Sequence, residues 1–183
     1  MENEEILNIG IDFINKAREH LEKAERVLAL NSFKQAEELF KQNGFSIQYA
    51  NCLCEQASIY TAQHYYDLAL KMLQEAETIF LGSRKDFERL NLVGCLINQA
   101  EIYLENGETD ISLKLYKRAE TICKKVGRAK ELYKCLDGQV DVYLEKSDYK
   151  TAKDILERIL KLAYILKDDE LVRNTKETIG DLS

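Results

Sequence analysis

The side chains of this chain that are best suited to metal binding or nucleophilic chemistry belong to five cysteines and two histidines. Cys52 and Cys54 are two residues apart, so on a helix they point in different directions, unlike the CxxC pairs of zinc and redox sites. His20 and His64 are far apart in the sequence and lack a Ser-His-Asp or HExxH context. The glycine patterns of P-loops and dinucleotide sites are also absent. We therefore expect no catalytic residue, no metal, no cofactor and no enzymatic activity.

A repeated pattern of side chains runs through four segments, residues 10–44, 50–81, 93–124 and 133–164. Each has a small residue, a ring three positions later, a small residue nine further on, a bulky one four later and a small or aliphatic one three after that. The four sets are Ala17, His20, Ala29, Phe33 and Ala36; Ala57, Tyr60, Ala69, Leu73 and Ala76; Ala100, Tyr103, Ser112, Tyr116 and Ala119; and Val140, Tyr143, Ala152, Leu156 and Ile159. Self-similarity on this length scale is typical of stacked helix pairs.

Three of the cysteines occupy one position of this pattern. Cys52, Cys95 and Cys135 each lie five residues before the small residue of the second, third or fourth segment. Equivalence across repeats favours buried, small, apolar side chains where helices pack, which is how free cysteine usually behaves. An odd total also leaves one thiol unpaired, which fits a reducing compartment.

The elements that position these side chains are predicted to be helices. Residues 50–62 have apolar residues at helical spacing, and a second helix is expected from about Tyr66. Turns are predicted at residues 62–65, 106–108 and 146–148, where Asp148 or Ser147 can cap the following helix. With no proline and only 8 glycines, the chain has no obvious linker, so we expect one all-α domain over residues 1–183.

Composition and charge limit the classes of partner that we expect for this protein. The formal charge of −6 comes from 32 acidic and 26 basic residues that are interleaved, so there is no basic stripe for nucleic acid. The first residues are acidic where a signal peptide would be basic, and no apolar run reaches the length of about 20 residues that a membrane span needs. We expect a cytoplasmic protein without a nucleic-acid or membrane partner.

The repeated set resembles the tetratricopeptide repeat (TPR) family, in which a small residue and an aromatic in the first helix meet Ala, an aromatic or Leu, and Ala in the second. The second and third repeats match best, whereas His20, Val140 and Ile159 depart from the pattern. The usual proline is missing, and the small residues Ala17, Ala57, Ala100 and Val140 are 40, 43 and 40 positions apart, where the common form has about 34. The chain is thus similar to the long-repeat members in kinesin light chains, LGN-like adaptors and Rap-type regulators.

This resemblance implies a right-handed α-solenoid of four helix-turn-helix repeats at about residues 5–44, 46–82, 86–126 and 129–167, with a capping helix at about 168–182. It also implies that the first helix of each pair lines a concave groove. The residues expected there are Ile14, Arg18, Asn51, Glu55, Ser58, Ile97, Asn98, Glu101, Asp137 and Asp141. The third and fourth repeats would make their part of the groove mostly acidic. The family's Lys, Asn and Arg clamp for a peptide carboxylate is missing at the matching positions, which are Ile14, Arg18, Glu55, Gly94 and Asn98.

The function that follows is that of a non-enzymatic interaction module or scaffold, which binds a basic or amphipathic segment of another protein in this groove. Three alternatives stay open. The carboxylates can be the solvated face of amphipathic helices, the protein can be a peptide-responsive regulator like the Rap proteins, or the array can associate with itself through its ends. Ile6, Leu7, Ile9 and Phe13 would support self-association or else close the N-terminal end. A monomer is the expected state.

Overall fold

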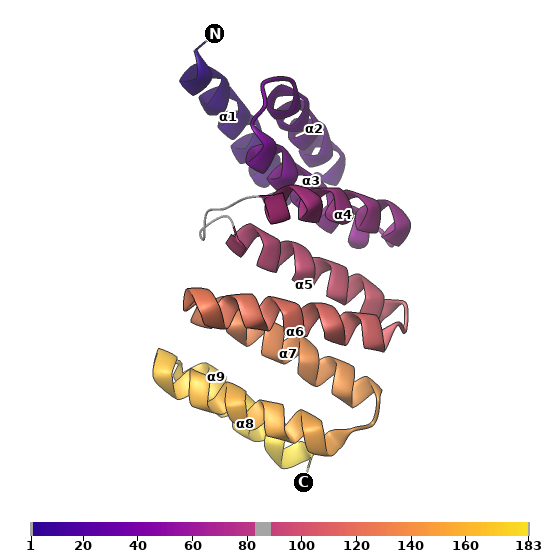
Figure 1. Ribbon diagram of the computed structural model, residues 1–183, viewed down its shortest axis with the longest axis vertical. Coiled ribbons are helices and arrows are strands. Elements are labelled where there is room, and N and C mark those ends of the chain that lie inside the picture. Colours follow the sequence, from indigo (N-terminus) through magenta and orange to yellow (C-terminus); the bar gives the residue numbers. More distant parts are fainter. Residues whose placement is uncertain (1, 83–88, 183) are drawn as a thin grey trace. The chain divides into compact units, whose positions relative to one another are not determined.

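The computed structural model describes residues 2–82 and 89–182. Within these residues the chain forms nine helices and no strand (Figure 1), which confirms the predicted all-α class. The helices are α1 (Asn3–Glu22), α2 (Arg26–Gln42), α3 (Ser46–Thr61), α4 (Tyr66–Gly82), α5 (Arg89–Glu105), α6 (Thr109–Val126), α7 (Ala129–Glu145), α8 (Tyr149–Leu166) and α9 (Asp169–Asp181). The expected start of the third repeat, residue 86, lies outside the described residues.

The helices group into two compact units, Met1–Cys95 and Leu96–Ser183, and α5 contributes to both. In the first unit α1 packs against α2, α2 against α3, and α3 against α4. In the second unit α6 packs against α7, α7 against α8, and α8 against α9. Each unit is therefore built from helices that pack on their neighbours in sequence, as in stacked helix pairs.

The core of the first unit is formed by the repeated small and bulky positions. The alanines at these positions have no exposed surface: Ala17, Ala29, Ala36, Ala57, Ala69 and Ala76. Phe33 and Leu73, the bulky members of the two sets, are also fully buried. Because a short side chain on one helix leaves room for a large one on the next, the alternation allows close helix packing without voids.

The second unit is built in the same way, although its small positions are less strict. Val140, Leu156 and Ile159 belong to a cluster of buried side chains from α7 and α8. Helix α9 packs on α8 and adds the half-buried Leu171 and Ile179 to the edge of this cluster, and Leu182, directly after α9, joins them. Aliphatic residues thus replace alanine in the last repeat without loss of burial.

Two glycines mark places where a helix meets an aromatic ring directly. A Cβ atom added to Gly10 would lie 2.2 Å from Cζ of Phe40, and one added to Gly138 would lie 2.2 Å from Cζ of Tyr116. Such distances are shorter than any real contact, so only glycine fits while the rings stay in place.

The turns follow the repeat as closely as the helices do. Ala24, His64, Gly107 and Ser147, which are equivalent positions seven residues after the first small residue, all have left-handed backbones with φ of 59°, 61°, 76° and 56°. The predicted turn at residues 62–65 is confirmed, because α3 ends at Thr61 and α4 begins at Tyr66. A left-handed residue lets the chain reverse within a few residues, but it costs a non-glycine residue free energy.

Of the two predicted caps for α8, only Asp148 serves. Its Oδ1 accepts a hydrogen bond from the backbone N–H of Thr151 at 3.1 Å, and its Oδ2 accepts one from the Thr151 hydroxyl at 2.7 Å. Ser147 instead occupies the left-handed turn position. Asp168 caps α9 in the same way, through the backbone N–H of Leu171 at 2.9 Å.

Candidate functional site: an acidic surface on α5 and α7

The candidate residues of the first unit lie on α1 and α3, and their charges neutralise each other. Arg18 on α1 donates a hydrogen bond through Nη2 to Oε1 of Glu55 on α3 at 2.8 Å. Ile14 is half-buried against the core that contains Ala17 and Phe33. Asn51 is half-buried, and Ser58 is exposed. This part of the expected site therefore presents an ion pair instead of a free acidic charge.

The candidate residues of the second unit lie on α5 and α7. Glu101, Asp137 and Asp141 are exposed, and Asn98 is half-buried. Ile97 differs from the expectation, because only 7% of it is exposed and it belongs to the core. A residue buried to this degree cannot provide the apolar contact that was expected from it.

Glu101, Asp137 and Asp141 form what we call the acidic surface. All three carboxyl groups have a pKa above the ordinary value, and in each the main cause is crowding by surrounding protein, which disfavours the ionised form although the side chains still reach water. Asp141 raises the pKa of Glu101 and of Asp137 further by like-charge repulsion. Lys134 acts in the opposite direction on Glu101. The surface thus concentrates negative charge that the protein stabilises poorly.

Two tyrosines accompany the acidic surface, and neither was expected at a site from its place in the sequence. Tyr116 on α6 is buried, which raises its pKa, and Glu101, Asp141 and Asp137 raise it further. Tyr133 precedes Asp137 by one helical turn on α7, and a hydrogen bond from it lowers the Asp137 pKa against the effect of burial. The spacing of Tyr133, Asp137 and Asp141 by four residues was the available signal, since it places all three on one face of α7.

Comparison with known proteins identifies the fold. No known family model and no curated protein sequence matches the chain. Among solved structures, BtubC from P. vanneervenii is 15% identical with a TM-score of 0.73, over 85% of this chain and 63% of that one. Apo RapI is 16% identical with a TM-score of 0.79, over 93% and 46%. A kinesin light chain from Podosopora anserina with nearly identical TPR-like repeats is 15% identical with a TM-score of 0.77, over 93% and 83%. This chain has a TPR-like fold.

The resemblance inferred from the repeated side chains is therefore confirmed at the level of fold. Identities this low carry no statement about activity. The chain spans 63% of the length of BtubC and 46% of that of RapI, so it corresponds to a part of each of those proteins.

The thiols of the TPR-like repeats behave as the pattern predicts. Cys52, Cys95 and Cys135 have at most 1% of their surface exposed, and all five cysteines are free. Burial raises the pKa of Cys52 to about 12, and Cys95 donates through Sγ to the carbonyl oxygen of Leu73 at 3.1 Å. Burial at these positions favours a packing role over a nucleophilic one.

The histidines have local partners. His20 Nδ1 lies 2.7 Å from Oε2 of Glu25, and His64 Nδ1 lies 2.7 Å from the hydroxyl of Tyr66. No group of three or more His, Cys, Asp or Glu side chains in residues 2–82 and 89–182 is arranged to hold a metal ion. Across the same residues, no helix combines the length and apolar character that crossing a membrane would require.

Proposed function

We propose that this TPR-like chain is a non-enzymatic protein-interaction module, and that the acidic surface binds a basic or amphipathic segment of a partner protein. The observation that carries the proposal is the convergence of Glu101, Asp137 and Asp141 from two helices, with the pKa of each raised. A carboxylate whose pKa is raised is less well stabilised than in water. A Lys or Arg side chain brought next to it would reverse that disadvantage.

The acidic candidate residue of the first unit is already paired, which favours the second unit as the place where a basic segment binds. Glu55, the acidic candidate on α3, already has the guanidinium of Arg18 at 2.8 Å. A cation from a partner would have to compete with Arg18 there. The pKa of Asp137 is instead shifted by burial, by the like charge of Asp141 and by Tyr133, and that of Asp141 is shifted by burial. Charge complementarity is therefore expected to act mainly through α5 and α7.

Apolar contacts would complete such a site. Leu104 on α5 and Leu144 on α7 are half-buried and follow the acidic residues along their helices. They could receive the apolar face of an amphipathic helix, while its Lys or Arg side chains reach the carboxylates. A segment with both features is thus a better fit than a purely basic one.

Self-association through the N-terminal end has less support. Ile6 is 5% exposed, and Leu7, Ile9 and Phe13 are half-buried. These side chains are largely engaged within the chain, which favours their role in closing the end of the array. We propose that the protein is a monomer.

The test uses an amidated, helical peptide rich in lysine and leucine as the probe. Titration should show an affinity that falls at least tenfold between about 50 and about 300 mM salt. The Asp137→Asn/Asp141→Asn variant should bind roughly tenfold more weakly. The matched control is Asp154→Asn/Glu157→Gln, which removes the same charge from exposed positions of α8. If the control weakens binding as much as the test variant does, only net charge matters and the acidic surface is not the site.

A further inference from the structure

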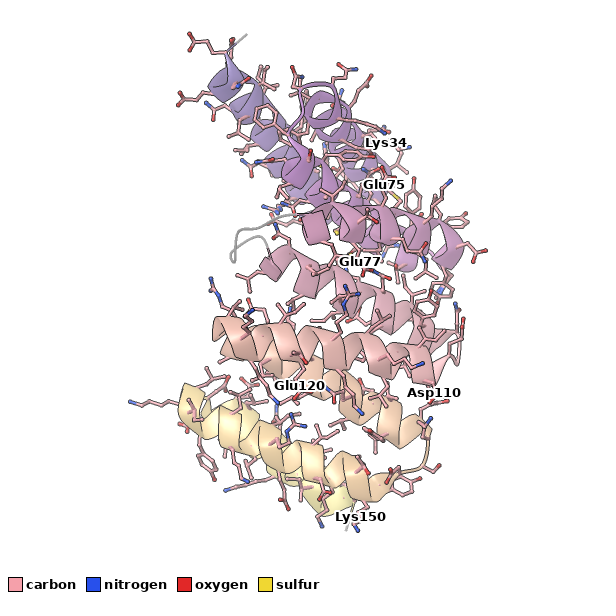
Figure 2. All side chains as sticks on the ribbon, in the orientation of Figure 1. Lys34, Glu75, Glu77, Asp110, Glu120 and Lys150 are labelled. Atoms are coloured by element: carbon pink, nitrogen blue, oxygen red, sulfur yellow. The ribbon has the colours of Figure 1, made fainter. Side chains whose placement is uncertain are left out.

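A second site candidate lies in the first unit, on residues that play no part in the acidic surface. A surface pocket of about 310 Å³ opens among α2, α3 and α4. Lys34 and Lys41 line it from α2, and Lys71 lines it from α4. Three cations around one pocket are notable in a chain whose formal charge is −6. Figure 2 shows Lys34 together with Glu75, another lining residue, on this part of the molecule.

The two carboxylates of the pocket already have hydrogen-bond donors. Gln56 donates through Nε2 to Oε2 of Glu37 at 2.6 Å, and the Tyr49 hydroxyl donates to Oε1 of Glu75 at 2.6 Å. Lys41 in turn donates to the Tyr49 hydroxyl at 3.2 Å, and its Nζ lies 4.9 Å from the centre of the Tyr49 ring. The floor of the pocket is thus an ordered polar network in which Glu37, Glu75 and Lys41 are engaged.

Lys34 and Lys71 are the cations that this network leaves available. Both side chains are exposed, and neither has a hydrogen bond or an ion pair among the described residues. They come from different helices, so an anion between them would contact both α2 and α4. A single carboxylate held by two ammonium groups gains more than one held by an isolated lysine.

The wall beside these lysines is apolar. Leu68 is 43% exposed, and Met72 is half-buried on the same helix as Lys71. An exposed leucine next to a flexible methionine offers an adaptable contact for one apolar side chain. The pocket therefore combines an anion position with a small apolar position.

We propose that this pocket binds an acidic segment of a partner protein, with one Asp or Glu carboxylate between Lys34 and Lys71 and a neighbouring apolar side chain against Leu68 and Met72. Phosphate and nucleic acid fit less well. All lining residues except Leu68 lie beyond the unpaired first N–H groups of their helices, so the cluster of backbone donors typical of phosphate sites is missing.

The chain provides its own reporter for this site, since Met72 is one of only two methionines. In protein labelled with ¹³C at the methionine methyl groups, titration with the acetylated, amidated hexapeptide Asp-Glu-Leu-Glu-Phe-Glu should shift the Met72 signal. The neutral analogue Asn-Gln-Leu-Gln-Phe-Gln should shift it much less. No movement of the Met72 signal at about 5 mM acidic peptide would overturn the proposal.

Variants separate the pocket from general electrostatics. Lys34→Gln/Lys71→Gln should weaken binding of the acidic peptide roughly tenfold. Lys16→Gln/Lys130→Gln removes two exposed cations elsewhere and should leave the affinity within about twofold. Equal losses in the two variants, or an equal response to inorganic phosphate, would refute a site for an acidic segment. The Asp137→Asn/Asp141→Asn variant should bind this peptide as the wild type does, so the outcome is independent of the function proposed for α5 and α7.

Discussion

Gln139 on α7 donates a hydrogen bond through Nε2 to Oε2 of Glu120 on α6 at 2.7 Å, and both side chains are buried. Gln56 and Glu37 make the same contact between α3 and α2 at 2.6 Å. In each case the glutamine precedes, and the glutamate follows, a small residue of the repeated pattern. The pairs are thus equivalent features of two repeats, and they link the second helix of one repeat to the first helix of the next.

Removing the donor of this pair is expected to destabilise the second unit. Gln139→Leu should lower the free energy of unfolding by about 1–3 kcal/mol, because a buried carboxylate loses a hydrogen bond and Leu adds no replacement. Urea unfolding followed by circular dichroism measures the change. Gln35→Leu, at an exposed position of α2, is the control and should stay within about 0.5 kcal/mol of the wild type. Equal effects in the two variants would contradict the structural role of the pair.

The acidic surface should make the protein less stable near neutral pH. In the folded state the pKa values of Asp137 and Asp141 are raised, so the folded protein binds protons more readily than the unfolded chain, and stability falls as pH rises through these values. Asp137→Asn/Asp141→Asn should therefore raise the free energy of unfolding at pH 7, by about 0.3–1 kcal/mol after allowance for screening by solvent. The gain should shrink as pH falls through the raised pKa values of the folded state, and it should vanish below the ordinary aspartate pKa of about 3.9, where the unfolded chain is protonated as well. Urea unfolding across this pH range is the measurement, and a gain that grew on acidification would disprove the raised pKa values.

An Ala→Gly substitution should have opposite effects on stability at a left-handed turn position and at a right-handed one. Ala24 has φ of 59°, so Ala24→Gly should raise the free energy of unfolding by about 0.5–1 kcal/mol. Ala62, which ends α3 with φ of −64° and ψ of −13°, has no such strain. Ala62→Gly should therefore lower stability by about 0.5 kcal/mol. Thermal and urea unfolding of both variants would show the difference, and the same sign at both positions would argue against the left-handed conformation at Ala24.

The contact between Gly138 and Tyr116 predicts a strong effect from a single methyl group. Gly138→Ala would place a Cβ 2.2 Å from Cζ of Tyr116, so the ring or the helix must move, at a cost of about 1–3 kcal/mol. Gly180→Ala in α9 is the matched control, because nothing lies within 4 Å of the added atom. It should leave stability unchanged or raise it by up to about 1 kcal/mol, because Ala favours a helix more than Gly does. Comparable melting temperatures for the two variants would mean that α6 and α7 are farther apart than the structure has them.

The structure also changes what the candidate site can be. Arg18 and Glu55 were both expected to face the groove, and they form one ion pair. Ile97 was expected to contact a partner, and it is buried. Glu101, Asp137 and Asp141 are the candidates whose exposure and perturbed pKa values fit the expected acidic character. Binding by these residues stays a prediction that the peptide titration tests.

The sequence by itself determined the helices, the turns and the buried small positions of the repeated pattern. Ala57, Cys135 and the turn before Tyr66 could be predicted because helical periodicity, small-residue spacing and capping act over a few residues along the chain. Tertiary structure alone decided which side chains meet: Glu120 with Gln139, Arg18 with Glu55, and the lysines around the pocket of the first unit. Such pairings depend on the spacing between helices and on the rotamers of long side chains. A repeat pattern sets which face a residue occupies, but the partner that its polar end reaches is set by the packed neighbouring helix.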